Sequence, residues 1–350
     1  MLINFVEAMR LATNRALEED KDVIVIGEGV PDPKAVFGTT RDLSRPSRVF
    51  DMPISENGGT GICIGAAVTG LKPILVHQRI DFSLYAMDQV VNNAAKWSSM
   101  YGGRAGTCPL VIRMIVGRGW GQGNQHSQNL SGLYASIPGL KVVAPSSASS
   151  AHALFLAAVQ DKNPVIFIEH RWLHNTESDF DVNQMPAEIG KAKVIPGRDL
   201  TIVSWSYQTV EALKLKKQLW ELNIDAEIVD LQTIRPIDWN TIFQSLDKTQ
   251  RLVVLDESWK TNGLAGEIMA KTYEMRRGIY DMIRITLPDC YCPSTPHLAK
   301  DFYPKQSEML EEILDLFHTV VGRKTAVNKL KDWEKSNHLD VPDKQFRGPF

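Results

Sequence analysis

Short apolar runs rich in β-branched residues alternate with amphipathic segments along most of this 350-residue chain. In the first half the runs are continuous rather than interrupted by polar residues, which is typical of parallel strands buried on both faces. The expected strands are 23–26, 73–76, 110–116, 140–143 and 164–168, and the expected helices are 5–19, 84–100 and 149–160. This order predicts an α/β domain with a doubly wound parallel sheet.

The same alternation returns after a polar, acidic stretch that has no apolar periodicity. The second set of expected strands is 200–204, 226–231, 251–256 and 282–286, and the expected helices are 207–222, 264–277 and 308–317. We therefore predict two doubly wound domains, at residues 1–175 and 197–324, joined by a linker at 176–196. Residues 325–350 are charged and contain no evident strand or core helix, so we expect a tail there.

Composition excludes several classes of protein. Lys and Arg number 39, and Asp and Glu number 41, so the net charge of −2 argues against nucleic acid or an acidic membrane as a partner. No run approaches the roughly 18 apolar residues of a membrane helix, and the acidic start does not resemble a signal peptide. The four cysteines form no C-x-x-C pair. We expect reduced or buried thiols in a cytoplasmic protein.

The segment PISENGGTG places a carboxylate, Glu56, at a glycine-rich helix start directly after a strand-like run. Ligands of doubly wound folds bind beyond the carboxyl ends of the strands, so Glu56 is a candidate ligand-facing acid. The alternative is a first-turn carboxylate that interacts only with the helix dipole.

Two further segments have the same position relative to a strand. In LVHQRIDFSLYAMDQ, Gln78 and Phe82 follow an apolar strand; the alternative is a turn glutamine and an aromatic core residue. In GRGWGQGNQHSQNL, His126 follows a glycine-rich loop and is a candidate acid or base, or else a structural residue. Arg118 and Trp120 interrupt these glycines. We expect this loop, 117–123, either to form the substrate entrance or to pack against a neighbouring subunit.

These segments together are similar to one family. The chain resembles the beta subunit of the thiamine-diphosphate-dependent decarboxylase component of 2-oxoacid dehydrogenases, within the transketolase-like superfamily, over about residues 2–321. The group includes pyruvate, branched-chain and acetoin dehydrogenase beta subunits. The motifs that carry the resemblance are VIGEGV, FDMPISENG, GICIGAAVTGLKPI, MDQVVNNAAK, NQHSQ, GLKVVAPSS, DKNPVIFIEH, EIVDLQTIRPID and LVVLDESWKTNGLAGEI. The resemblance implies a pyrimidine-binding transketolase-like domain followed by a transketolase C-terminal-like domain.

The resemblance also implies roles for individual residues. Glu56 would hydrogen-bond the aminopyrimidine ring of thiamine diphosphate, with Ile54 and Phe82 against that ring and Gln78 beside it. His126 would lie near the substrate carboxylate or the acyl acceptor. Glu56 must hold a proton when the cofactor is activated, and apolar surroundings would favour this by raising its pKa.

Some relatives bind potassium in a structural loop, so the resemblance implies a structural potassium site here as well. It would use mostly carbonyl oxygens, which suit a hard monovalent cation. The implied ligands are Leu110, Ala158, Val159, Asp161 and Asn163.

No GDG motif, which would hold magnesium and the cofactor's diphosphate, occurs in the chain. In the family an alpha subunit supplies that half of the site, so the resemblance implies an enzyme that is active only as a heterotetramer of two alpha and two beta subunits. The implied reaction is oxidative decarboxylation of a 2-oxo acid with acyl transfer to lipoyl, and a lipoyl acyltransferase would be a further partner.

Two alternatives remain open at this stage. A biosynthetic carboligase would use the same cofactor but pass the acyl group to a carbonyl compound. A non-catalytic scaffold for an alpha subunit would need neither Glu56 nor His126. The sequence leaves undetermined the 2-oxo acid, the acyl acceptor, docking on a multienzyme core and the role of residues 325–350.

Overall fold

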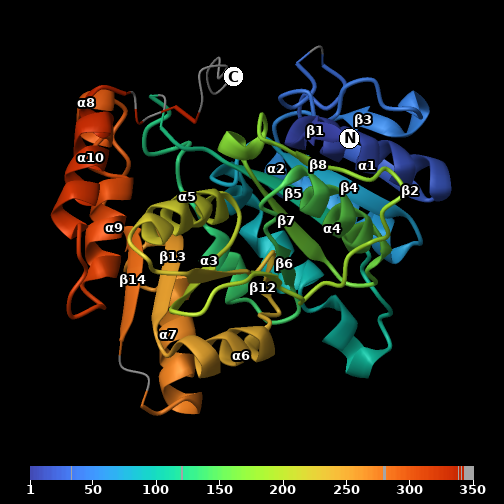
Figure 1. Ribbon diagram of the computed structural model, residues 1–350. Coiled ribbons are helices and arrows are strands. Elements are labelled where there is room, and N and C mark those ends of the chain that lie inside the picture. The colour runs from blue at the N-terminus through green and yellow to red at the C-terminus, as the bar shows by residue number, and fades with distance from the viewer. Residues whose placement is uncertain (33, 120, 279–280, 338, 340, 343–350) are drawn as a thin grey trace.

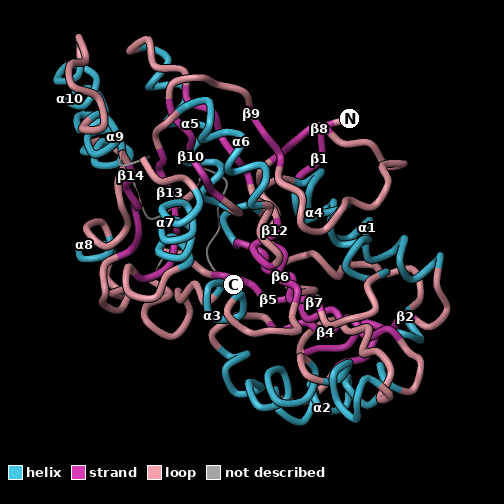
Figure 2. The backbone as a smooth tube through the Cα atoms, turned by 90° about the horizontal axis from the view of Figure 1, so that it is seen from below, coloured by secondary structure: helices cyan, strands magenta, loops and turns pink. Residues whose placement is uncertain are grey.

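The computed structural model describes residues 1–350 except 33, 120, 279–280, 338, 340 and 343–350 (Figure 1). Within this part of the chain, strands form a seven-stranded sheet, a five-stranded sheet and a two-stranded pair. Helices cover both faces of the larger sheet, and the smaller sheet lies beside it (Figure 2). The α/β class and the two-domain arrangement are those predicted. No helix among the described residues has the length and apolar character needed to cross a membrane.

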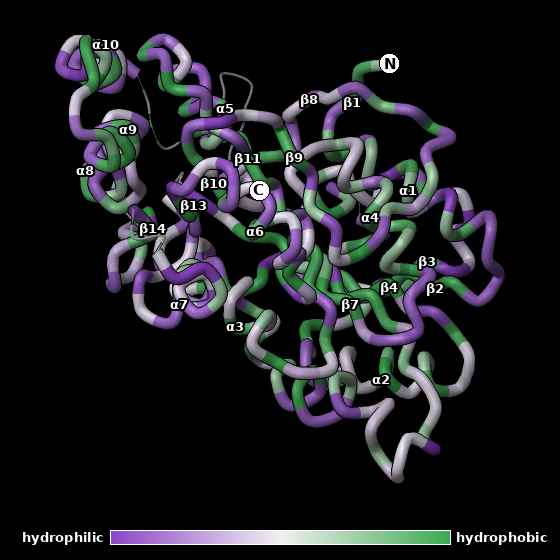
Figure 3. The backbone as a smooth tube through the Cα atoms, turned by 60° about the horizontal axis from the view of Figure 1, so that its bottom comes forward, coloured by the Kyte–Doolittle hydropathy of each residue, from purple (hydrophilic) through white to green (hydrophobic). Residues whose placement is uncertain are grey.

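The first sheet has the strand order β12-β6-β7-β5-β4-β2-β3. Its strands are β2 (Val23–Gly27), β3 (Val49–Asp51), β4 (Lys72–His77), β5 (Val111–Val116), β6 (Lys141–Val143), β7 (Val165–His170) and β12 (Thr233–Arg235). All neighbours pair in parallel except β12 and β6. The continuous apolar runs therefore have the predicted meaning, and the strands β4 and β7 at the centre of this domain are coloured hydrophobic in Figure 3.

Successive residues of the central strands face two different cores. On β4, Ile74 and Val76 pack with α1 (Phe5–Glu19) and α4 (Ala148–Gln160). Leu75 packs on the opposite face with α2 (Glu56–Val68) and with Tyr134 of α3 (Ser131–Ala135). This alternation follows from the two-residue period of a strand, and it buries both faces of the sheet.

The second sheet has the order β14-β13-β10-β11-β9. Its strands are β9 (Lys193–Ile195), β10 (Leu200–Ser204), β11 (Ala226–Asp230), β13 (Leu252–Trp259) and β14 (Met282–Leu287). The helices of this part are α5 (Tyr207–Glu221), α6 (Trp239–Thr249), α7 (Leu264–Met275), α8 (Pro296–Ala299), α9 (Gln306–Leu314) and α10 (Arg323–Lys335). One hydrophobic cluster runs from α2 and β5 into β10, β13 and α7, so the two sheets share a core.

Several segments differ from the sequence-based expectations. The helix expected at 84–100 is broken into a 3₁₀ turn (Phe82–Ala86), a π-helical turn (Asp88–Ala94) and a second 3₁₀ segment (Trp97–Gly103). The polar stretch between the domains contains β8 (Glu177–Asp179), which pairs with β1 (Leu2–Asn4), and it also contains β9. Each of these strands has only three residues, so neither shows a repeating apolar pattern in the sequence.

The tail also contains regular structure. Helix α10 contributes the buried Val327 to the second-domain core, with Ala326 and Leu330 packed against the same cluster. Its Glu334 carboxylate accepts hydrogen bonds from the backbone N–H and hydroxyl of Ser307, at 2.8 and 2.6 Å. The expectation of a tail without a core helix is therefore wrong for this segment, because three apolar residues at helical spacing suffice to dock it.

Candidate functional site

The predicted site residues gather at one edge of the first sheet. Strands β5, β4, β2 and β3 are parallel neighbours, so their carboxyl ends meet there. Ile54 and Glu56 follow β3, Gln78 and Phe82 follow β4, and His126 lies in the segment after β5. This is the edge at which doubly wound sheets bind ligands.

Glu56 is the first residue of α2, and only 9% of it is exposed. The helix start packs tightly against Met52, because a Cβ on Gly59 would lie 1.9 Å from the Met52 methyl carbon. Ile54, two residues earlier, is 83% exposed. A buried carboxyl therefore stands beside an apolar side chain that is open to a ligand or a partner.

A second acid, Glu28, follows β2 and was not singled out from the sequence. Burial raises the pKa of Glu28, and the negative charges of Glu56 and Asp51 raise it further. The neighbouring carboxyls at this edge therefore favour the protonated form of Glu28. The available signal was an acid directly after a buried parallel strand, in VIGEGV.

Gln78 is held by the turn that follows β2. Its Nε2 donates to the carbonyl of Glu28 at 2.9 Å, while the Gly29 N–H donates to the Asp51 carboxylate at 2.9 Å. Gly29 has a positive φ of 66°, and a Cβ there would lie 2.8 Å from Gln78 Nε2. Only glycine adopts this backbone conformation without strain. The two hydrogen bonds join the ends of β2, β3 and β4.

Phe82 and His126 meet edge to face, with 5.3 Å between ring centroids and 83° between ring planes. Burial lowers the pKa of His126, and the positive charge of Arg79 lowers it further. The imidazole is therefore biased toward its neutral form, which accepts a proton or a hydrogen bond.

The charged residues of the HQRID segment turn inward. Arg79 is 2% exposed, and its guanidinium carbon lies 4.9 Å from the ring centroid of Phe37. One carboxylate oxygen of Asp81 accepts from the backbone N–H and the side-chain amide of Gln128, at 3.2 and 2.8 Å. The segment after β4 is thereby tied to the residues that follow His126.

Arg118 lies at the contact between the two domains. It is buried, and its Nη1 donates to a Glu257 carboxylate oxygen at 2.8 Å. Its charge is already paired with a carboxylate of the second domain, so it is not free to bind a substrate carboxylate. Trp120, the other residue of that hypothesis, lies outside the described residues. The contacts agree with packing, although within this chain rather than against a neighbouring subunit.

The loop that was expected to bind potassium is in contact with a lysine ammonium group. Lys141 Nζ forms an ion pair with the Asp161 carboxylate, whose other oxygen accepts from the Asn163 N–H at 2.9 Å. The carbonyls of Ala158 and Leu110 accept backbone hydrogen bonds at 3.2 and 2.9 Å, and Val159 is buried in α4. The structure brings the five residues together around the end of α4, but it does not need potassium to neutralise Asp161.

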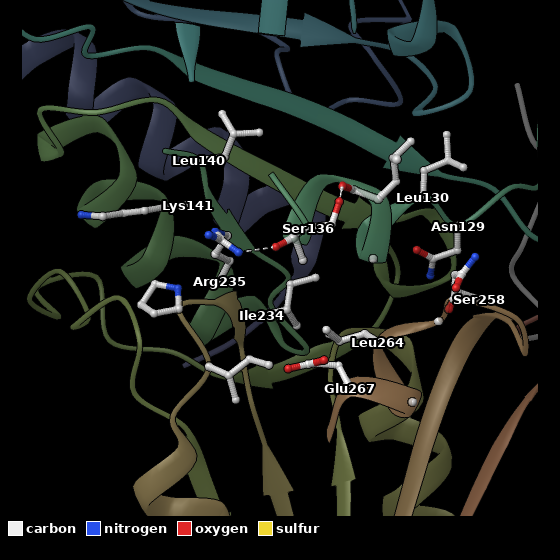
Figure 4. A pocket seen from close by; sticks show the side chains of 18 of the residues that line it. Asn129, Leu130, Ser136, Leu140, Lys141, Ile234, Arg235, Ser258, Leu264 and Glu267 are labelled. Carbon is white, nitrogen blue, oxygen red and sulfur yellow. Dashed lines mark hydrogen bonds between the residues drawn. The ribbon is translucent and has the colours of Figure 1, made fainter. Parts of the chain in front are cut away.

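A separate cleft of about 1490 Å³ opens between the domains. Leu130, just before α3, Arg235 of β12, and Leu264 and Glu267 of α7 line it, as Figure 4 shows. None of the residues predicted to contact the cofactor lines this cleft. Among the described residues, no group of three or more His, Cys, Asp or Glu side chains is placed to hold a metal ion.

The two halves of the fold match two known families of protein domains. Residues 2–176 match the family described as "Transketolase, pyrimidine binding domain", and residues 190–309 match "Transketolase, C-terminal domain". A solved structure titled "Split gene transketolase, inactive beta4 tetramer" has the same fold. It has a TM-score of 0.75 and 21% identity, over 90% of this chain and 98% of that one.

Curated relatives match over most of their length. A "Pyruvate dehydrogenase E1 component subunit beta" of Rickettsia bellii (strain RML369-C) is 42% identical over 77% of this chain and 84% of that protein. An "Acetoin:2,6-dichlorophenolindophenol oxidoreductase subunit beta" of Bacillus subtilis (strain 168) is 35% identical over 90% of this chain and 97% of its own length. A mitochondrial "Pyruvate dehydrogenase E1 component subunit beta-1" of Arabidopsis thaliana is 39% identical over 87% and 86%.

Proposed function

This chain belongs to the transketolase-like beta subunits of 2-oxoacid dehydrogenases, and from that premise we propose that it supplies the pyrimidine half of a thiamine-diphosphate site. The observation that carries the proposal is the convergence of Glu56, Gln78, Phe82 and His126 at adjoining strand ends. When bound, the cofactor supplies a carbon nucleophile that decarboxylates a 2-oxo acid and retains the acyl fragment.

The residues present fit the pyrimidine half of that cofactor. Glu56 offers a buried carboxyl, and Ile54 offers an exposed apolar surface for a flat ring. The Phe82 ring packs edge to face with His126, and the Gln78 amide is fixed by the Glu28 carbonyl. In this assignment Glu56 holds the proton that activates the pyrimidine. Glu28 lies in the same group, and burial together with the charges of Glu56 and Asp51 raises its pKa.

His126 serves in the proposal as the group that faces the substrate. Burial and the charge of Arg79 bias it toward the neutral form. A neutral imidazole accepts a proton or a hydrogen bond from the substrate or from the incoming acyl acceptor. Its contact with Phe82 places it next to the ring that would pack on the cofactor.

We assign magnesium and the diphosphate to an alpha subunit, in a heterotetramer of two alpha and two beta subunits. This part of the proposal rests on the sequence resemblance and on the names of the relatives. The most direct test is calorimetry of thiamine diphosphate with magnesium, titrated into the purified chain and into its reconstituted pair with the alpha subunit. We expect tight, magnesium-dependent binding only in the pair. Equal binding by the lone chain would overturn the split site.

The acyl acceptor is proposed to be lipoyl on an acyltransferase partner. The reconstituted pair should be offered a panel of 2-oxo acids, with free or protein-bound lipoyl groups in one set and aldehydes in another. Reductive acylation of lipoyl supports a dehydrogenase component. Carbon–carbon bond formation without lipoyl acylation would favour the carboligase alternative instead.

Potassium binding by the loop at the end of α4 remains a prediction, and substitution of Lys141 provides a test of it. Thermal unfolding of the chain in potassium chloride should be compared with unfolding in choline chloride of equal ionic strength. The Lys141→Met variant removes the ammonium that binds Asp161. If the loop takes potassium, this variant gains more stability from potassium than the wild type does. An equal response to both salts in both proteins would remove the site. We also propose a cytoplasmic location, which the four free thiols support.

A further inference from the structure

Arg118 lies in the loop that leads to His126, yet it is held by the second domain. Its Nη1 donates to Glu257 Oε1 at 2.8 Å, and Glu257 belongs to β13. The guanidinium carbon lies 4.5 Å from the ring centroid of Trp172 and 4.4 Å from that of Tyr303. An ion pair enclosed by aromatic rings is a built contact between two parts of the chain that are 139 residues apart.

The same carboxylate holds a second strand end of the first sheet. Glu257 Oε2 lies 2.9 Å from His170 Nε2, and His170 is the last residue of β7. Burial alone would raise the pKa of Glu257, but the charges of Arg118 and His170 hold it at about 2. Glu257 therefore joins the ends of β5 and β7 to the second sheet through these two contacts.

Three glycines near His126, on either side of residue 120, are in close contact with other segments. A Cβ on Gly117 would lie 2.1 Å from the carbonyl oxygen of His126, so these two backbones are in contact. The Gly119 N–H donates to the Tyr303 hydroxyl at 3.2 Å. At Gly123, a Cβ would lie 2.3 Å from the hydroxyl oxygen of Ser294. The histidine loop is thus enclosed by residues of the C-terminal part of the chain.

We propose that Arg118 is a positioning residue, and that its pairing with Glu257 lets the second domain hold His126 in its reactive arrangement. The inference rests on the proposed function for the catalytic role of His126, but not for the contact itself. It assigns to the second domain a task at a site to which, within this chain, the first domain contributes the proposed catalytic and cofactor-binding groups. A 1 Å misplacement of a reacting group can cost about a hundredfold in rate.

The first experiment measures His126 directly and needs no turnover. Diethyl pyrocarbonate modification of His126 in the purified full chain should be followed by peptide mass spectrometry across pH. In Arg118→Met we expect about tenfold faster modification and a higher midpoint pH, because the ring becomes more exposed. Arg118→Lys should lie between this variant and the wild type. Arg235→Met is the matched control, since Arg235 Nη1 also bridges the domains, to the Ala135 carbonyl at 2.7 Å, but away from the loop.

A second variant separates positioning from folding. Arg118→Met leaves Glu257 buried without its partner, whereas Arg118→Met with Glu257→Leu replaces the pair by apolar side chains, which proteins often tolerate. In the reconstituted pair this double variant should keep its melting temperature and KM but lose about tenfold to a hundredfold in kcat. Wild-type modification kinetics and kcat in the folded double variant would overturn the proposal. Absence of 2-oxo acid turnover in the wild-type pair would instead contradict the proposed function and leave the modification test valid.

Discussion

The close contact between Gly117 and the backbone of His126 allows a quantitative prediction about catalysis. An added Cβ at residue 117 would lie 2.1 Å from the His126 carbonyl oxygen and 2.4 Å from Gln122 Oε1. The Gln122 side chain can move away from an added Cβ, but the carbonyl oxygen of His126 belongs to the backbone. Real Cβ contacts essentially never fall below 3.0 Å, so the backbone at His126 must shift by about 1 Å.

We therefore expect Gly117→Ala to fold and to lower kcat by about a hundredfold, since a displacement of that size misaligns a reacting group. The assay is steady-state turnover of the reconstituted pair, with circular dichroism melting of the variant chain. Gly266→Ala is the control. It is a helical glycine whose added Cβ would meet only the end of the Arg284 side chain, at 2.9 Å, so it should be neutral or slightly stabilising.

A double-mutant cycle with His126→Ala decides the cause of the loss. If Gly117→Ala acts through the histidine, it should cost little in the His126→Ala background. A hundredfold loss in both backgrounds would mean that the glycine acts elsewhere. Wild-type turnover by a folded Gly117→Ala chain would refute the argument from the contact.

Three further predictions concern stability. The buried His77, with a pKa of about 4 lowered by burial, binds its proton on unfolding between about pH 6.5 and 4. Acidification through that range should therefore lower the unfolding free energy of the wild type by about 3 kcal/mol more than that of His77→Leu. Chemical denaturation at each pH measures both losses, and equal losses would contradict the prediction. Glu169→Gln leaves the fully buried Arg113 without its bidentate carboxylate, so calorimetry should show a loss of about 3–5 kcal/mol, and an unchanged melting temperature would contradict this. Val327→Asp should detach α10 and lower the melting temperature of the second domain, whereas a surface tail would show no effect.

The strand order along the chain was predictable because the physical signal is local. Continuous apolar runs bounded by turn residues mark buried parallel strands. Residues just beyond such runs are candidates for ligand binding, which is why Glu56, Gln78 and His126 could be named from the sequence. Glu28 has the same position after β2, and it could have been named by the same rule.

Arg118 shows what a local pattern cannot reveal. In the sequence it is a charged residue among glycines, which indicates a mobile surface loop. In the fold it is buried because its partner, Glu257, arrives from the second domain 139 residues later. The strand β12 raises the same difficulty, since three residues far from the first domain complete its sheet. Contacts between distant segments decide burial, and a single sequence does not display them.

The central claim is that Glu56 activates the pyrimidine half of thiamine diphosphate. The most direct measurement is the rate at which the thiazolium C2 proton of the bound cofactor exchanges with deuterated water, in wild-type and Glu56→Gln heterotetramers. Quench and proton NMR of the released cofactor give this rate without any substrate. The account predicts exchange at least about a hundredfold slower in Glu56→Gln, with cofactor still bound and assembly intact. Equal exchange rates in the two proteins would contradict it.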